Sequence, residues 1–146
     1  MGRKNRNIKK RLREEKKKEQ RKTRISRTKI ESTVAHFLDN LGIVYRQNQN
    51  IGRFNVDFLV DDKYIIECYG NFWHCNPQKY PPDFYNRGLK CEAHERWNKD
   101  QKRQEELESL GYQFLALWEN EIQNAPKLCK IKVMRLLNSN YKSPLD

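Results

Sequence analysis

Two carboxylates near the middle of the chain have the spacing of a metal site. Asp57 and Glu67 lie on consecutive apolar stretches, ten residues apart. Residues 61–63, Asp-Asp-Lys, have the length of a hairpin loop that sets Val60 opposite Tyr64 and therefore Asp57 opposite Glu67. Opposed side chains of an antiparallel pair lie on one face, about 5 Å apart at Cβ. Because like charges at this distance repel each other, the pattern predicts a divalent cation held by these hard oxygen ligands.

A histidine and a third acid follow at positions from which the chain can fold back over that pair. His74 lies seven residues after Glu67, directly beyond the second apolar stretch. Asp100 lies on a predicted polar helix, on a face shared with Arg96 and Arg103, where an isolated acid has no packing role. A histidine beside a metal site can act as a general base, and an acid can fix its tautomer and orientation.

Each of these side chains also has a purely structural interpretation. Asp57 fits an ordinary strand edge, and His74 fits an aromatic pocket. Asp100 and Glu31 fit the protein surface, where Glu31 also caps a helix. Glu67 is the exception, because a carboxylate inside a central strand is unfavourable without a partner or a metal. The inference of a reactive site therefore rests on the joint pattern.

Hydrophobic periodicity and helix stop signals predict the elements that must position these residues. The motif Thr28-x-x-Glu31 is a capping box, and Gly42 and Gly111 are expected to end helices. The order αβββαβα predicts an α/β fold, a sandwich of a mixed sheet between helices on both faces. The predicted elements are a helix over 28–41, strands near 43–48, 54–60 and 64–69, an aromatic-rich loop over 70–92, a polar helix over 93–110, a strand over 112–118 and a helix from 126 onward.

Positive charge is concentrated in the first 29 residues, which hold fifteen Lys and Arg against three Glu. The remaining 117 residues are nearly neutral, with fifteen basic and sixteen acidic side chains. We expect a basic, helical arm over residues 1–27, too poor in apolar residues to form a core, and a folded domain over 28–146. This charge density favours phosphate binding over a merely solubilising tail. The expected phosphate contacts of the arm are Arg3, Lys4, Arg6, Lys9, Lys10, Arg11, Arg13, Lys16, Lys17, Arg21, Lys22, Arg24 and Arg27.

Composition also argues against several other classes of protein. No run of eighteen apolar residues is present, so no membrane span and no membrane partner are expected. The N-terminus lacks the apolar segment of a secretory signal. The four cysteines form no Cys-x-x-Cys pair and are expected to be free thiols of an intracellular protein; they are Cys68, Cys75, Cys91 and Cys129.

Over residues 28–122 the order and spacing of these features resemble the PD-(D/E)xK nucleases. Asp57 and Glu67-Cys-Tyr69 on consecutive strands, with Glu31 on a preceding helix, carry the resemblance. Further along, Glu67-Cys-Tyr-Gly-Asn-Phe-Trp-His74, Asp100 and Leu110-Gly-Tyr-Gln-Phe-Leu-Ala-Leu-Trp-Glu119 are similar to one branch, which contains the very short patch repair endonuclease and the phage-type homing endonucleases with a Glu-Asp-x-His-Asp signature. The resemblance implies that the signature residues are Glu31, Asp57, His74 and Asp100, and that Glu67 is the first acid of the ExK motif.

The chain departs from this family pattern in two places. Tyr69 stands where the ExK lysine belongs, so no lysine there activates water, which suits a branch in which a histidine takes part. The structural zinc ligands of the repair enzyme are also missing, which puts its mode of mismatch recognition in doubt. Their aligned positions hold Asn71, Asn76, Gln78 and Asn120, and structural zinc is not expected; a different zinc site of Cys75, Cys91 and His94 is a minority hypothesis.

Together these features predict a Mg²⁺-dependent (or Mn²⁺-dependent) endonuclease acting on double-stranded DNA, of the phage or mobile-element homing type, in the cytoplasm or nucleoid of a bacterial host. The expected metal ligands are Asp57, the backbone carbonyl of Cys68 and, directly or through water, Glu67. His74 is the expected general base, oriented by Asp100. Glu31 would position water or a second metal. Further DNA contacts are expected near the cleft mouth from Arg53, Lys79 and Arg87. Stacking on bases or wedging between them is expected from Phe72, Trp73, Tyr80 and Tyr85, with core packing as an equal alternative for Phe72 and Trp73.

Two other hypotheses fit the same residues. One is a repair nickase acting on mismatched or damaged DNA, which needs the same chemistry. The other is a nucleic-acid-binding or assembly protein that kept the fold without catalysis. The basic arm alone satisfies this last hypothesis, but it leaves the retained acids and histidine unexplained.

Overall fold

The computed structural model describes residues 8, 10–14 and 28–138 of the chain. Within the arm, residues 8 and 10–14 are helical and exposed, so the described part of the expected helical arm is present. Of the predicted phosphate contacts in the arm, Lys10, Arg11 and Arg13 belong to this helix, and the others lie outside the described residues. No helix among the described residues has both the length and the apolar character needed to cross a membrane.

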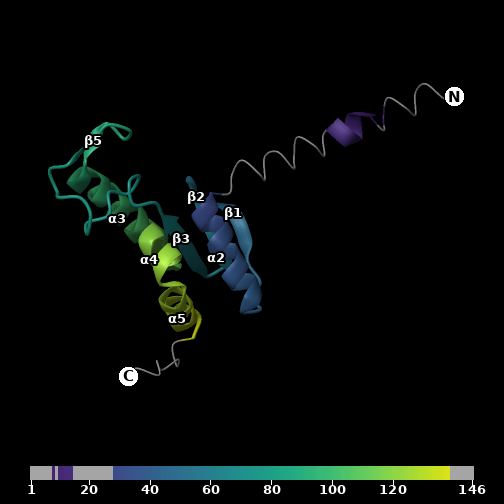
Figure 1. Ribbon diagram of the computed structural model, residues 1–146. Helices are drawn as coiled ribbons and strands as arrows, with labels where there is room; N and C mark the ends of the chain where they lie inside the picture. The colour runs from purple at the N-terminus through teal and green to yellow at the C-terminus, as the bar shows by residue number, and fades with distance from the viewer. Residues whose placement is uncertain (1–7, 9, 15–27, 139–146) are drawn as a thin grey trace.

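The centre of the domain is the mixed four-stranded sheet that the element order predicts (Figure 1). Its strands are β1 (Arg46–Ile51), β2 (Phe54–Val60), β3 (Tyr64–Tyr69) and β6 (Gln113–Trp118), in the spatial order β1-β2-β3-β6. Neighbouring strands pair antiparallel except β3 and β6, which pair parallel through the long connection that contains α3 (Ala93–Ser109). A parallel pair requires such a crossover, so this connection places α3 against the sheet.

The hairpin between β2 and β3 has the predicted register. Val60 pairs with Tyr64 and Phe58 with Ile66, which sets Asp57 opposite Glu67 one step further along. The loop closes with a hydrogen bond of 3.1 Å from the Lys63 amide to the Val60 carbonyl. Both aspartates of the loop have left-handed backbone conformations, with φ of 53° and 52°, which Asp tolerates better than most residues.

Helices cover both faces of the sheet (Figure 1). The first face packs against α2 (Lys29–Asn40), α4 (Glu119–Asn124) and α5 (Pro126–Leu137), and the second face packs against α3. Successive strand residues point to opposite faces, so neighbours such as Leu59 and Val60 belong to different cores. The larger core contains Val34, Leu38, Phe58, Val60, Ile66, Leu117, Ile122 and Val133; the smaller contains Ile51, Val56, Leu59, Ile65 and Leu107.

Three local features differ from the sequence prediction. The first strand spans Arg46–Ile51 and not 43–48, because a two-residue turn at Gly52 pairs Ile51 with Phe54 and draws the strand toward it. The segment over 70–92 is not wholly irregular: it contains a short hairpin of β4 (Tyr85–Asn86) and β5 (Cys91–Glu92). Helix α4 was not predicted, since six residues are too few for a clear helical period.

Candidate active site

A cleft of about 710 Å³ opens between α2, the sheet and α3, and the five predicted site residues all line it. Glu31 comes from α2, Asp57 from β2, Glu67 from β3, His74 from the loop after β3 and Asp100 from α3. Residues from five separate segments therefore converge on one cavity. We refer to Asp57 and Glu67 as the acid pair, and to His74 and Asp100 as the histidine dyad.

The acid pair combines a half-buried and a buried carboxylate on adjacent strands. Asp57 Oδ2 accepts a hydrogen bond of 2.8 Å from the backbone amide of Cys68, which ties the two strands together beyond the last ladder pair. Glu67 is 5% exposed. Burial above all, and then the neighbouring charge of Asp57, raise the pKa of Glu67 to about 8. The ionised pair is therefore unfavourable unless a positive charge joins it.

Arg103 from α3 supplies one such charge, which offsets only part of the effect of burial on the Glu67 carboxylate. Its Nη2 lies 2.6 Å from Glu67 Oε1, and this proximity opposes the rise in the pKa of Glu67 without overcoming burial. That oxygen is buried, and the guanidinium of Arg103 is the positive charge in contact with it. Nη2 also donates to the Asn55 carbonyl at 2.8 Å. A buried carboxylate is costly even beside one cation, and a further cation would lower that cost.

The acid pair fits a divalent ion such as Mg²⁺. Carboxylate and carbonyl oxygens are the ligands that Mg²⁺ prefers, and it commonly uses one or two carboxylates while keeping several waters. Among the described residues no cluster of three or more His, Cys, Asp and Glu side chains forms a complete metal cage. The residues that would supply ligands are Asp57, Glu67 and, through its backbone, Cys68. Burial raises the pKa of the Cys68 thiol, which stays protonated and leaves the backbone carbonyl as the donor of that residue.

The predicted hydrogen bond of the histidine dyad is present, with 2.8 Å between His74 Nδ1 and Asp100 Oδ2. Because a carboxylate only accepts, His74 donates through Nδ1, and its Nε2 carries the free lone pair. Arg96 lies beside the dyad, with its Nε 3.1 Å from the other Asp100 oxygen. Arg96 Nη2 is also 3.3 Å from His74 Nδ1, but two donors face each other there, so this contact is not a hydrogen bond in that tautomer.

Tyr69, two residues after Glu67, holds the His74 ring. The two rings stack at 3.9 Å between centroids and 6° between planes. Trp118 supports Tyr69 edge-on, with 5.2 Å between centroids and an interplanar angle of 78°. Burial, followed by the charges of Asp100 and Glu67, raises the pKa of Tyr69 above its usual range. The phenol therefore stays neutral and serves as a platform.

Glu31 has the capping role that its motif predicts, and it also faces the cleft. The amide of Glu31 donates to Thr28 Oγ1, and the amide of Thr28 donates to Glu31 Oε2, both at 3.3 Å. Its charge contributes to the raised pKa of Cys68, which indicates that Glu31 lies close to β3. Helix α2 thus begins at the cleft and brings a buried acid there.

The lip of the cleft carries two exposed aromatic side chains. Phe72 is 39% exposed and Trp73 is 55% exposed, and their rings meet edge-on at 5.1 Å. The alternative prediction, that Phe72 and Trp73 pack in the core, is therefore wrong. Gly88 lies under them, and a Cβ at that position would approach the Trp73 ring to 3.0 Å. Tyr85 is also exposed, whereas Tyr80 is half-buried and stacks on Phe84.

A hydrogen-bonded network connects the four amide residues that the family resemblance led us to compare with zinc ligands. Asn76 Nδ2 donates to Asn71 Oδ1 at 2.8 Å and to Asn120 Oδ1 at 3.0 Å, while its own Oδ1 accepts from the Gln78 amide at 3.0 Å. Asn120 Nδ2 and Gln78 Oε1 are 3.4 Å apart. The network joins the loop after β3 to the start of α4, next to the amide of Asn71 that donates to Glu119.

The side chains of the minority zinc hypothesis are engaged elsewhere. Cys75 is buried, and its sulfur accepts from Asn86 Nδ2 at 3.5 Å. His94 Nε2 pairs with Glu92 at 2.7 Å on the surface. Cys91 is half-buried in β5. These contacts do not assemble the three residues into a site.

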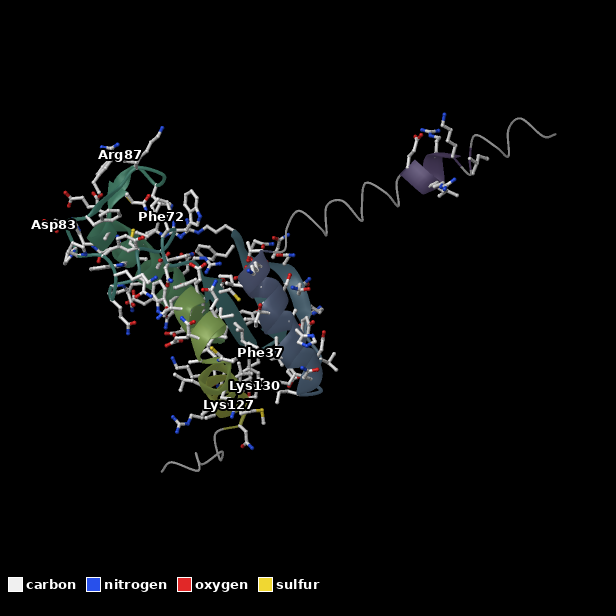
Figure 2. The ribbon with its side chains drawn as sticks, in the orientation of Figure 1. Phe37, Phe72, Asp83, Arg87, Lys127 and Lys130 are labelled. Atoms are coloured by element: carbon white, nitrogen blue, oxygen red, sulfur yellow. The ribbon has the colours of Figure 1, made fainter. Side chains whose placement is uncertain are left out.

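The cations that line the cleft are not those predicted for its mouth. Arg53, Lys79 and Arg87 are absent from the lining; Arg53 pairs with Glu106, and Arg87 lies at the outer end of the loop that carries Phe72 (Figure 2). The basic lining residues are Lys29, Arg96 and Arg103. The two arginines share a helix face with Asp100, at spacings of four and three residues, and this spacing was the available signal. Glu119 and Gln123 of α4 also line the cleft and were not predicted.

Comparison with known proteins identifies a relative in sequence and a similar fold among solved structures. No protein-family model matches the chain. Over 120 residues it is 30% identical to the type II nicking enzyme V.NmeAIP of Neisseria meningitidis serogroup A, and the match covers 75% of this chain and 80% of the relative. The fold is similar to the homing endonuclease I-Bth0305I catalytic domain, with a TM-score of 0.56 and 24% identity, over 79% of this chain and 99% of that domain.

Proposed function

The chain belongs to the family of the type II nicking enzyme V.NmeAIP, and on this premise we propose that it is a Mg²⁺-dependent endonuclease that hydrolyses phosphodiester bonds in double-stranded DNA. One observation carries the proposal. The acid pair, the histidine dyad and Glu31 line a single cleft, although they come from five segments of the chain. Mn²⁺ has similar ligand preferences and is expected to replace Mg²⁺.

Asp57, Glu67 and the carbonyl oxygen of Cys68 would hold the ion, whose chemistry is to lower the pKa of water and to stabilise negative charge on the phosphate. Asp57 is already oriented for this by the Cys68 amide. Glu67 must lose a proton to take part, because its pKa without the ion is about 8. Binding of the ion would thus release the proton of Glu67.

His74 would accept the proton of the attacking water at Nε2. Asp100 holds Nδ1 at 2.8 Å and thereby keeps the lone pair on Nε2. The stack on Tyr69 fixes the plane of the imidazole, which leaves the ring little freedom to rotate. Glu31 would orient a water molecule or a second ion from the α2 side of the cleft.

The exposed aromatic pair would contact the bases of the bound DNA. Phe72 and Trp73 directly precede His74, so a base stacked on them would lie near the histidine dyad. Stacking on an aromatic ring contributes about 1–3 kcal/mol per base and tolerates different sequences. The basic arm would add affinity through the phosphates, without sequence choice.

Within this activity, a homing-type enzyme of a phage or mobile element, acting inside a bacterial host, remains our first hypothesis. A repair nickase is the second candidate, and the relationship to a nicking enzyme favours it. The two differ in their DNA substrate and in how many strands they cut. A protein without catalysis is a third hypothesis, which does not explain the fully assembled dyad and acid pair.

The test is incubation of the protein with supercoiled plasmid in Mg²⁺, in Mn²⁺ and in EDTA, followed by mapping of the DNA ends. The proposal predicts metal-dependent cleavage that EDTA abolishes. An open-circular product indicates nicking, and a linear product indicates cleavage of both strands. Intact plasmid under both metals, with DNA binding retained, would favour the binding-protein hypothesis instead.

A further inference from the structure

Arg103 is held inside the cleft by three contacts with two neighbouring strands, β2 and β3. Its Nη2 pairs with Glu67 Oε1 at 2.6 Å and donates to the Asn55 carbonyl at 2.8 Å. Its guanidinium carbon lies 5.5 Å from the centroid of the Phe54 ring. The side chain is 21% exposed, so its position is constrained while part of it still reaches the cavity.

These contacts leave most of the hydrogen-bonding capacity of the guanidinium unused. Arginine carries five N–H donors in a planar fork, and both polar contacts use Nη2. Neither Nε nor Nη1 donates to another described residue. A planar group with free donors, fixed in a cleft, matches the bidentate geometry in which arginine binds phosphate.

Arg96, the other arginine that lines the cleft, has different partners. Arg96 lies against Asp100 and His74, so its charge supports the histidine dyad. Arg103 lies against Glu67 and is therefore the arginine beside the acid pair. Tyr69, two residues after Glu67, contributes no positive charge to this part of the cleft.

Resting on the proposed function, we propose that Arg103 is a catalytic residue that contacts a non-bridging oxygen of the phosphate to be cleaved. Glu67 and the Asn55 carbonyl hold the guanidinium in place for this contact. A fixed cation at a phosphate stabilises the charge that develops in the transition state, at no cost of reorganisation. A role limited to neutralising Glu67 is the alternative, and the two roles predict different results.

The test measures DNA affinity at several salt concentrations for Arg103→Gln, in Ca²⁺ to prevent cleavage. Loss of one phosphate contact lowers the slope of log affinity against log salt by about 0.9. The matched control is Lys102→Gln, which removes the same charge from the next residue of α3, where the side chain is exposed and outside the cleft. We expect the slope to fall for Arg103→Gln and to change less for the control.

A second pair of variants separates phosphate binding from neutralisation of Glu67. In the Glu67→Gln background no negative charge remains at residue 67 for Arg103 to balance. If Arg103 contacts the phosphate, Arg103→Gln lowers affinity and salt slope in this background as well. If it only balances Glu67, the double variant binds DNA like Glu67→Gln, and that result would overturn the inference. Thermal melting of each variant verifies that it is folded.

Cleavage in Mg²⁺ gives the remaining readout. We expect Arg103→Gln to lose about 10²–10³-fold in rate, as for removal of one donor to transition-state charge, and Arg103→Lys to keep part of it. If the wild-type protein and a folded Arg103→Gln variant cleave equally well, the role of Arg103 is contradicted and the proposed function is not. A wild-type protein that does not cleave contradicts the proposed function, and the salt slopes then still report whether Arg103 contacts phosphate.

Discussion

The acid pair and the histidine dyad sit in the same cleft but are built in different ways. The acid pair lies on two strands joined by a three-residue loop, and its geometry follows from local hairpin register. The dyad joins a loop residue to a helix residue 26 positions away, and an aromatic stack holds it in place. Burial raises the pKa of Glu67 in the acid pair despite its ion pair with Arg103, whereas a hydrogen bond of 2.8 Å joins the two residues of the dyad. The difference fits the roles that we propose, in which the acid pair binds a cation and the dyad moves a proton.

Breaking the acid pair should have the largest effect. Asp57→Asn keeps the size of the side chain but removes the charge that would hold the ion, so cleavage should fall to background while folding and DNA binding persist. Plasmid cleavage and a binding assay measure the two properties separately. The control is Asp61→Asn, an exposed acid in the loop of the same hairpin, which should cleave normally. Normal cleavage by Asp57→Asn would remove the acid pair from the mechanism.

Substitutions in the histidine dyad should lower the cleavage rate less, because the acid pair remains intact. His74→Ala should lower the rate by about 10²–10⁴, the range typical of general acid–base catalysis. Asp100→Asn should cost less, since the imidazole is still present. The double variant should be little worse than His74→Ala, because residues that act as a unit are not additive. Fully additive losses in single-turnover rates would show that the two residues work independently.

Substitutions in the exposed aromatic pair, Phe72 and Trp73, should weaken DNA binding and leave the rest of the site intact. Trp73→Ala removes a large exposed ring and should weaken affinity by about 1–3 kcal/mol, roughly 5-fold to 150-fold. Val44→Ala, an exposed apolar residue that does not line the cleft, is the control. Fluorescence anisotropy with a labelled duplex measures both. Equal affinities for the two variants would mean that the lip does not stack on bases.

The raised pKa of Glu67 predicts that the stability of the acid pair depends on pH. The unfolded carboxyl has a pKa near 4.5 and the folded one a pKa of about 8, so the folded state holds the extra proton between these values. Stability without metal should therefore fall as pH rises from about 4.5 to about 8, by at most about 1.4 kcal/mol for each pH step of one. Glu67→Gln should flatten this dependence in denaturant melts. The exposed Glu106→Gln should not, and equal slopes for both variants would contradict the assignment.

The predictable parts of the molecule are those determined by neighbours in sequence. The capping box of Thr28 and Glu31, the hairpin register and the polar helix of Asp100 all follow from short-range rules. The pairing of His74 with Asp100 was predicted from their side-chain chemistry. The stack of Tyr69 on His74 was not, because it depends on the path of the loop after β3.

The contact between Arg103 and Glu67 was not predicted either, for a similar reason. A helix face gives the direction of Arg103 but not which strand residue it meets, and that depends on how α3 crosses the sheet. The short β4–β5 hairpin and α4 carry too few residues for a periodic signal. Exposure of Phe72 and Trp73 also depends on packing, since aromatic residues are more often buried than exposed.

The most direct test of the central claim is calorimetric titration of Mg²⁺ into the wild-type protein, Asp57→Asn and Glu67→Gln between pH 6 and pH 9. The acid pair predicts one ion per chain, bound more tightly as pH rises to about 8 and then level, with release of the Glu67 proton below that pH. Either substitution should weaken binding strongly, and Glu67→Gln should also abolish the proton release. Binding that is independent of pH and unchanged in both variants would contradict a metal site at Asp57 and Glu67.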